Sequence, residues 1–224
     1  EKSHEAIEKK VTEALEADAI PIVLGGDHSI TLPSATAVAK KYGYGNVGMV
    51  HFDAHADTGD STYGDVLISH GSPMRRLIES GAIPGKNFVQ IGLRGPWPYP
   101  KNLQWMKDQG MRWHLMAEIE KKGFDEVLEM AISEALDGPD KLYISVDVDV
   151  MDPAFAPGTG TPEPGGITSL ELLRAIREIV LSKGMVAMDV VEVAPVYDQP
   201  GDITAQAAHR CIYEAISALA KKKL

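Results

Sequence analysis

Acidic and histidine residues in two short segments of the sequence are spaced so that they could bind metal ions. Residues 53–57 read Asp-Ala-His-Ala-Asp, and residues 147–149 read Asp-Val-Asp. Alternate residues of an extended strand point to the same face, so a spacing of two directs these polar side chains to one side. Carboxylates gathered in this way repel one another unless a cation neutralises them. No Lys or Arg lies within 25–32 or 51–70, so a divalent metal ion is the simplest partner.

The candidate ligands are four carboxylates and two imidazoles. This set is too large for one ion and suits two, and its mixture of carboxylate and imidazole favours Mn²⁺ or a similar borderline-hard ion. Two ions ~3.5–4 Å apart could share a water molecule and lower its pKa, which would give hydroxide at neutral pH. The six candidates are His28, Asp53, His55, Asp57, Asp147 and Asp149.

Other polar residues near these segments are interpreted as structural. We expect His51 to lie one residue off the metal-binding face and to point away from it. Asp27 and Ser29 are typical N-cap residues of a helix, and Asp152 is typical of a turn because Pro follows it. Three more residues are expected to be packing or ordinary polar residues without a catalytic role: His114, His209 and Cys211.

Strand-like and helix-like periodicities alternate along the chain and predict an α/β fold. A strand followed by a helix, repeated, indicates a parallel sheet with helices on both faces. The expected strands are 19–24, 46–52, 87–93, 111–115, 141–148 and 185–193. The expected helices are 2–17, 29–42, 73–80, 102–109, 124–136, 169–182 and 204–221.

The candidate ligands follow the carboxyl ends of these expected strands. Ligands of open α/β sheets bind beyond that edge, so the four strand ends that carry acids or histidines are expected to meet there. The longest stretch without predicted secondary structure is 153–166, which is rich in Pro and Gly. A loop of that length inside a compact domain is more often functional than not.

Composition excludes several classes of function. The 22 basic and 32 acidic residues give a net charge of −10, which argues against nucleic acid or an anionic membrane as the main partner. A single cysteine excludes a disulfide scaffold. No apolar run has the length of a membrane span, and the first twenty residues lack a signal-peptide core, so we expect a cytosolic protein. No Ser-, Pro- or Gly-rich linker divides the chain, so one domain over 1–224 is expected.

Three segments, in this order, resemble the arginase/agmatinase family of ureohydrolases. They are 25–29, 51–58 and 145–166, and the resemblance extends to 69–73 and 191–195. It covers nearly the whole chain, and it implies a three-layer α/β/α fold with a mainly parallel central sheet. It also implies two Mn²⁺ ions per subunit and a homo-oligomer, either a trimer or a hexamer. Members of the family begin with a further strand and loop before the position of Glu1, so the N-terminal strand segment is expected to be missing here.

The resemblance also implies a role for each matching residue. One ion would be held by His28, Asp53, Asp57 and Asp147, and the other by Asp53, His55, Asp147 and Asp149. A hydroxide bridging the ions would attack the guanidinium carbon of a small guanidino substrate and release urea and an amine. His70 matches the histidine that passes a proton to the leaving amine, which suits the near-neutral pKa of imidazole. Glu192 matches the carboxylate that binds the guanidinium group.

The guanidino compound itself stays open at this point. The segment Thr58–Ser69 is expected to form a wall of the pocket, and it contains Asp60 and Asp65 but no basic residue. This charge favours agmatine, whose hydrolysis gives putrescine for polyamine biosynthesis, over a guanidino acid. The segment 161–166 also resembles guanidino-acid hydrolases, such as guanidinobutyrase, guanidinopropionase and proclavaminate amidinohydrolase, so these remain the alternative.

An alternative of another class is a metal-binding relative that does not catalyse the reaction. His70 and Glu192 are both present, and a protein that only binds metal needs neither of them. The sequence therefore favours an enzyme, an amidinohydrolase that acts on linear amidines.

Overall fold

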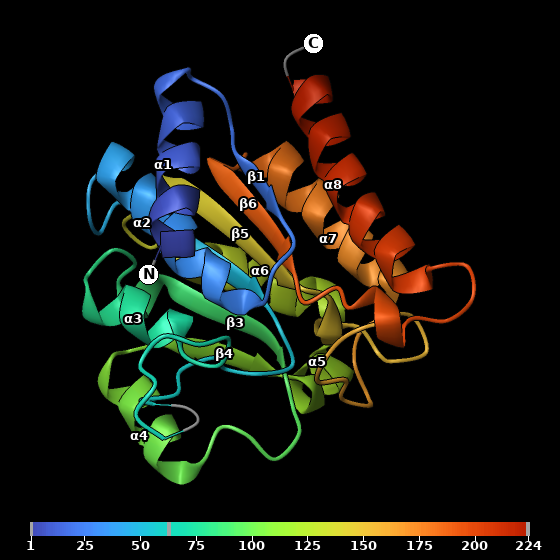
Figure 1. Ribbon diagram of the computed structural model, residues 1–224. Coiled ribbons are helices and arrows are strands. Elements are labelled where there is room, and N and C mark those ends of the chain that lie inside the picture. Colours follow the sequence, from blue (N-terminus) through green and yellow to red (C-terminus); the bar gives the residue numbers. More distant parts are fainter. Residues whose placement is uncertain (1, 62–63, 223–224) are drawn as a thin grey trace.

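The computed structural model describes residues 2–61 and 64–222 and confirms an α/β fold (Figure 1). Within these ranges six strands form one sheet, in which every neighbouring pair is parallel. The strands are β1 (Ile22–Leu24), β2 (Val47–Phe52), β3 (Phe88–Leu93), β4 (Arg112–Leu115), β5 (Lys141–Asp147) and β6 (Ala187–Val191). Their order across the sheet is β1-β6-β5-β2-β3-β4.

Helices cover both faces of the sheet, which gives the three layers that were predicted. Figure 1 shows α1 and α2 on one side and α7 and α8 on the other. The helices are α1 (Lys2–Glu16), α2 (Thr31–Tyr42), α3 (Pro73–Glu79), α4 (Pro100–Asp108), α5 (Met116–Lys122), α6 (Phe124–Ala135), α7 (Ser169–Ser182) and α8 (Ile203–Lys222). Two apolar clusters fill the layers between sheet and helices: one packs α5 to α8 on the sheet, and the other packs α1 to α4 on it.

The central strands form where the sequence has short, nearly continuous apolar runs. Every residue of β2, β3 and β6 is buried, as expected for parallel strands that are covered on both faces. The edge strand β1 is shorter than predicted, because only Ile22–Leu24 pair with β6. Helix α5, which follows β4 directly, was not predicted from the sequence. No helix in the described part of the chain is long and apolar enough to cross a membrane.

The topology brings distant acids together at one edge. From β2 the sheet continues through β3 to β4 at one edge. The next strands in the sequence, β5 and β6, lie on the other side of β2. In the register between β2 and β5, Phe52 lies opposite Val146. The residue that follows each of these is an aspartate, so Asp53, just beyond β2, and Asp147, the last residue of β5, lie side by side at the carboxyl edge of the sheet.

Candidate metal centre

His28 faces three carboxylates at the carboxyl edge of the sheet. The chain leaves β1 through two glycines and enters a short 3₁₀ turn, in which the side chain of Asp27 caps the backbone N–H of Ser29. This turn points the fully buried ring of His28 into the site. Its Nδ1 lies 3.1 Å from Oδ2 of Asp53, 3.1 Å from Oδ2 of Asp57 and 3.2 Å from Oδ2 of Asp147. The structure thus brings together the four residues expected to share one ion.

The residues expected to hold the second ion lie beside this group. The Nδ1 atom of His55 is 2.9 Å from Oδ2 of Asp149 and 3.6 Å from Oδ1 of Asp53. Backbone groups orient the carboxylates: the N–H of His55 donates to Asp53 Oδ1 at 2.6 Å, and the N–H of Asp149 donates to Asp147 Oδ1 at 2.8 Å. Asp149 in turn accepts the N–H of Ala54 at 3.0 Å. All six predicted ligands therefore gather at one place.

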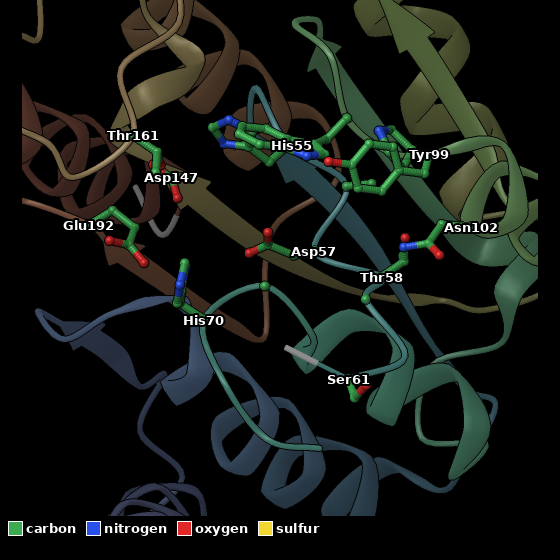
Figure 2. Close-up of a pocket in the computed structure, with 15 residues that line it drawn as sticks. His55, Asp57, Thr58, Ser61, His70, Tyr99, Asn102, Asp147, Thr161 and Glu192 are labelled. Carbon is green, nitrogen blue, oxygen red and sulfur yellow. The ribbon is translucent and has the colours of Figure 1, made fainter. Parts of the chain in front are cut away.

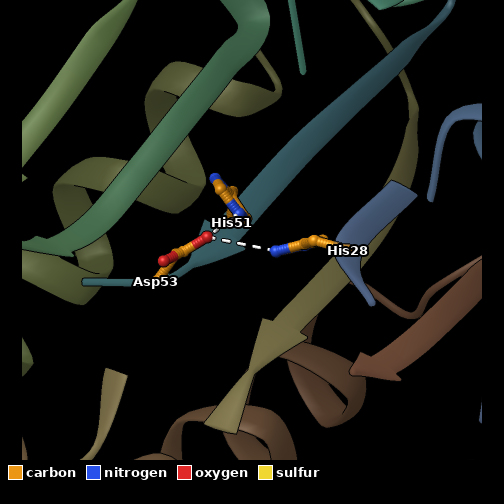
Figure 3. A group of neighbouring side chains, drawn as sticks. All are labelled: His28, His51 and Asp53. Atoms are coloured by element: carbon orange, nitrogen blue, oxygen red, sulfur yellow. Dashed lines mark ion pairs between the residues drawn. The ribbon is translucent and has the colours of Figure 1, made fainter. Parts of the chain in front are cut away.

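The interpretation of His51 was wrong. Its Nε2 lies 2.9 Å from Oδ2 of Asp53, and its ring packs edge-on against His28 with the ring centroids 4.8 Å apart (Figure 3). Because Asp53 comes two residues after His51, just beyond the end of β2, the two side chains share one face of the extended chain. His28, His51 and Asp53 form one of two groups among the described residues whose ligand atoms are close enough to hold an ion, and Asp53, His55 and Asp149 form the other.

The chemistry of these atoms fits metal ions. Among the described residues, five buried atoms of this site make no hydrogen bond: Nδ1 of His28, both ring nitrogens of His51, Oδ2 of Asp53 and Nε2 of His55. Buried polar atoms are normally satisfied, so a group of unsatisfied ones needs a partner that the chain does not supply. Two divalent cations would provide it, and their charge would balance the four carboxylates of the predicted ligand set.

Without metal, the carboxylates of the site differ in their tendency to ionise. Burial, together with Asp149 and Asp53, raises the pKa of Asp147 well above its usual range. Burial and the charge of Asp53 raise the pKa of Asp149 to about 6. Burial acts in the same direction on Asp53, but the imidazoles of His51 and His28 outweigh it and lower the pKa of this carboxyl. Asp53 is therefore the most stable anion of the three.

The histidines respond in the opposite sense. Burial lowers the pKa of His28, but the carboxylates of Asp147, Asp53 and Asp57 overcome it and raise this pKa well above its usual range. In the same way Asp149 outweighs burial at His55 and raises its pKa to about 9. The metal-free site thus neutralises part of its own charge by keeping protons on its imidazoles, and bound metal ions would replace those protons.

A cavity of about 610 Å³ opens beside the cluster (Figure 2). His55, Asp57 and Asp147 of the cluster line it, together with both predicted catalytic residues, His70 and Glu192. The backbone N–H of His28 donates to Oε1 of Glu192 at 2.8 Å, and burial raises the pKa of this carboxyl. Glu192 and Asp57 have φ angles of 64° and 50°, a left-handed backbone that is uncommon outside glycine and that often occurs at functional sites.

A family model described as the arginase family matches residues 1–218. The chain belongs to the arginase family. It is 42% identical over 205 residues to the guanidinopropionase of Pseudomonas aeruginosa, a match that covers 92% of this chain and 62% of that protein. It is 43% identical over 202 residues to the mitochondrial agmatinase of Gallus gallus, with 89% of this chain and 57% of the relative covered. The chain therefore spans about three fifths of the length of these relatives.

A solved structure confirms the fold. A formiminoglutamase variant from Trypanosoma cruzi, crystallised with Mn²⁺, superposes with a TM-score of 0.89 at 25% identity. The match covers 99% of this chain and 72% of that one.

The outer wall of the cavity in this arginase-family chain was not found from the sequence. Trp97, Tyr99 and Asn102, which follow β3, line it, and the ring centroids of Trp97 and His55 are 6.0 Å apart. The one available signal was a run of aromatic residues directly after a predicted strand. The loop 153–166 also reaches the cavity, where Thr161 lines it as its length had suggested.

The predicted wall Thr58–Ser69 is only partly visible, because Thr62 and Tyr63 lie outside the described residues. Asp60 in this segment forms ion pairs with Arg75 at 3.3 Å and Arg76 at 3.5 Å. Its charge is thus already paired, and it does not line the cavity.

Arg94 is a cation near the metal centre that was not predicted from the sequence. Its guanidinium group donates to the carbonyl oxygen of Asp149 at 2.7 Å and to that of Glu163 at 2.6 Å. Further bonds reach Gly92 and Val150. Arg94 therefore connects the segment after β5 to the loop 153–166. Its N–H groups donate to carbonyl groups of the backbone and not to the carboxylates of the site.

Proposed function

We propose that this protein is a manganese-dependent ureohydrolase that cleaves the C–N bond of a guanidino compound and releases urea and an amine. One observation carries the proposal: the imidazole of His28 faces the carboxylates of Asp53, Asp57 and Asp147 at 3.1–3.2 Å, at the wall of a cavity that Glu192 also lines. When bound there, two manganese ions supply Lewis acidity and lower the pKa of water enough to give a nucleophile at neutral pH.

Glu192 binds the guanidinium group of the substrate. A planar guanidinium pairs with a carboxylate through two parallel N–H···O bonds, which fixes both its plane and its distance. The hydrogen bond from the backbone of His28 orients Glu192 before the substrate arrives. A carboxylate held in this way places the guanidinium carbon beside the metal ligands at little further cost in entropy.

His70 transfers a proton to the nitrogen that leaves. Departure of an amine from the carbon requires that its nitrogen be protonated, because an amide anion is too basic to leave in water. His70 lines the same cavity as Glu192 (Figure 2). An imidazole gives and takes protons near neutral pH and therefore suits this step.

Agmatine is the substrate that the cavity favours. The described residues that line it include no Lys or Arg to pair with a carboxylate tail. Trp97 and Tyr99 offer aromatic faces, which attract an ammonium group. A guanidino acid is the second candidate, because the chain is 42% identical to a guanidinopropionase and 43% to an agmatinase. Neutral donors in the wall, such as Asn102, could bind its carboxylate.

The test is to load the purified protein with Mn²⁺, count the bound ions, and measure urea release from a panel of compounds. The panel contains agmatine, arginine, 4-guanidinobutyrate, 3-guanidinopropionate and free guanidine. Two ions per chain and urea from agmatine support the full proposal, and urea from a guanidino acid alone moves the substrate to the second candidate. A Glu192→Gln control should keep both ions and lose turnover, since it removes the charge that pairs with guanidinium. Two bound ions without urea from any compound would favour the non-catalytic relative, and no bound metal would overturn the proposal.

A further inference from the structure

A series of buried hydrogen bonds runs from His28 into the interior of the sheet, away from the cavity. The Nε2 atom of His28 lies 2.9 Å from Oγ of Ser145, and this hydroxyl donates to Oδ1 of Asp189 at 2.8 Å. Ser145 and Asp189 lie opposite each other on β5 and β6, and all three side chains are completely buried. Neither Ser145 nor Asp189 belongs to the six expected ligands or lines the cavity.

Two further hydroxyl groups hold Asp189 from the other side. The hydroxyl of Tyr143 donates to Oδ2 at 2.6 Å, and the hydroxyl of Thr31 donates to the same atom at 2.8 Å. Burial and the neighbouring Asp189 carboxylate raise the pKa of Tyr143 well above its usual range, so its phenol keeps its proton and remains a donor. Asp189 thus accepts three hydrogen bonds from hydroxyls, as an ionised carboxylate that can only accept does.

The direction of these bonds determines which nitrogen of a neutral His28 ring carries the proton. A serine hydroxyl has one hydrogen, and Ser145 gives it to Asp189. Only lone pairs of Ser145 then face His28, so Nε2 must be the donor between them. A neutral imidazole that is protonated on Nε2 has its lone pair on Nδ1, the atom that faces Asp53, Asp57 and Asp147.

We propose that Asp189 and Ser145 are positioning residues that fix neutral His28 in the Nε2–H tautomer and thereby present Nδ1 to a metal ion. The proposal rests on the metal site of the proposed function. Partners behind a metal-binding histidine commonly set its tautomer and orientation, and their removal typically lowers metal affinity by about 10- to 100-fold. A purely structural role, in which Asp189 only joins β5 to β6 and α2, predicts lower stability without this loss of affinity.

The sharpest variant is Asp189→Asn, which keeps the shape of the side chain. Thr31 and Tyr143 both donate on the Oδ2 side, so the amide oxygen is expected there and the NH₂ group faces Ser145. Ser145 then gives its hydrogen to Nε2 of His28, which moves the imidazole proton to Nδ1 and removes the lone pair that would bind metal. Ser145→Ala removes the hydroxyl that connects Asp189 to His28. This change is smaller, and the variant is used for the test if Asp189→Asn does not fold. The matched control is Tyr143→Phe, which deletes one donor to the same carboxylate but leaves the direction toward Ser145 intact.

Mn²⁺ affinity and stoichiometry are measured by titration for the parent, the three single variants and the double variant Ser145→Ala/Asp189→Asn. We expect one of the two ions to bind about 10- to 100-fold more weakly in Asp189→Asn and in Ser145→Ala, with no change in Tyr143→Phe. Because Asp189 acts through Ser145, the double variant should lose no more affinity than Ser145→Ala alone. Histidine ¹⁵N spectra of the Zn²⁺-loaded parent should place a proton on Nε2 of His28.

Three results would overturn the proposal that Asp189 and Ser145 set the tautomer of His28. They are an Mn²⁺ affinity of Asp189→Asn equal to that of the parent, losses of affinity that add in the double variant, or a proton on Nδ1 of His28 in the Zn²⁺-loaded parent. If the parent binds two Mn²⁺ ions and any of these results is found, the positioning role of Asp189 and Ser145 is rejected and the proposed function stands. A parent that binds no Mn²⁺ rejects the proposed function itself.

Discussion

Without metal, the protein should lose stability as the pH rises from 6 to 9, and bound manganese should counteract this loss. Asp149 and other carboxylates raise the pKa of His55 to about 9, whereas an unfolded chain has a histidine pKa of 6.5. A raised pKa means that the folded state binds the proton more tightly. The stabilisation is complete below pH 6.5 and disappears as the pH rises through 9.

The size of the effect follows from the shift at His55. A difference of about 2.5 pH units corresponds to about 3 kcal/mol of unfolding free energy. For a chain of this length, each kcal/mol changes Tm by about 2–4 °C, so Tm should fall by about 6–12 °C. Asp149 adds a change in the same direction at lower pH, because its pKa is raised to about 6 and its ionisation between pH 4 and 6 costs stability.

Manganese should counteract this dependence. Metal ions bind neutral imidazole and ionised carboxylate, so they compete with the protons that His55 and Asp149 hold, and their affinity rises with pH. At a fixed Mn²⁺ concentration the gain in Tm over the metal-free protein should therefore grow from pH 6 to pH 9.

Thermal unfolding followed by circular dichroism, with and without a chelator, measures both trends. A His55→Asn variant should flatten the metal-free curve, and His209→Asn, which changes an exposed histidine on α8, should leave it unchanged. A metal-free Tm that stays constant or rises toward pH 9 would refute the reasoning. A His55→Asn curve as steep as that of the parent would place the titrating group elsewhere.

Three further predictions concern single residues. Asp149→Ala should lose one of two Mn²⁺ ions and nearly all urea release, because it removes a ligand of only one ion; unchanged stoichiometry would reject that assignment. Arg94→Met should lower the unfolding free energy by at least about 3 kcal/mol, because several buried carbonyl groups lose their hydrogen-bond donor. Thermal melts measure this loss, and a loss below about 1 kcal/mol would show that water molecules replace the guanidinium group as donors. Thr168→Ala should cost about 1 kcal/mol in the same melts, because Thr168 and Glu171 form a capping box at the start of α7; an unchanged Tm would show that this cap contributes nothing.

The metal centre could be predicted because its information is local. Asp53, His55 and Asp57 follow one strand at a spacing of two, and Asp147 and Asp149 follow another. The rule that parallel strands share one carboxyl edge then suffices to join the two groups. The register of β2 against β5 supplies the detail that the sequence lacks, since it places Asp53 next to Asp147.

The expectation that His51 points away from the ligands was wrong, although the spacing of two applies to His51 as it does to Asp53. His51 has the same parity as Asp53 and lies on the last part of β2, so the period of two already placed its ring on the side of the ligands. The structure shows it against Asp53 Oδ2 at 2.9 Å. The side of the strand on which His51 lies can therefore be read from the sequence alone.

Other features could not be predicted, because their partners come from distant parts of the chain. Arg94 contacts carbonyl groups 55 to 70 residues away, and a lone arginine after a strand gives no sign of this. Asp189 lies in the middle of an apolar strand, and its three donors come from two other elements. Such contacts depend on register and on helix placement, which periodicity does not fix.

The charges at the carboxyl edge show why these residues form a binding site and not a self-contained part of the fold. Burying an ionised carboxylate is costly unless the chain supplies a cation or enough donors. Asp189 receives three hydroxyl donors and is satisfied from within. Asp53, Asp147 and Asp149 lie equally deep, but the nearby guanidinium of Arg94 bonds to carbonyl groups, and the histidines that face them must take up protons to balance them. The fold thus supplies hydrogen-bond donors for the carboxylate of Asp189 but no permanent positive charge for the other three carboxylates. This is the property expected of a site that binds metal ions.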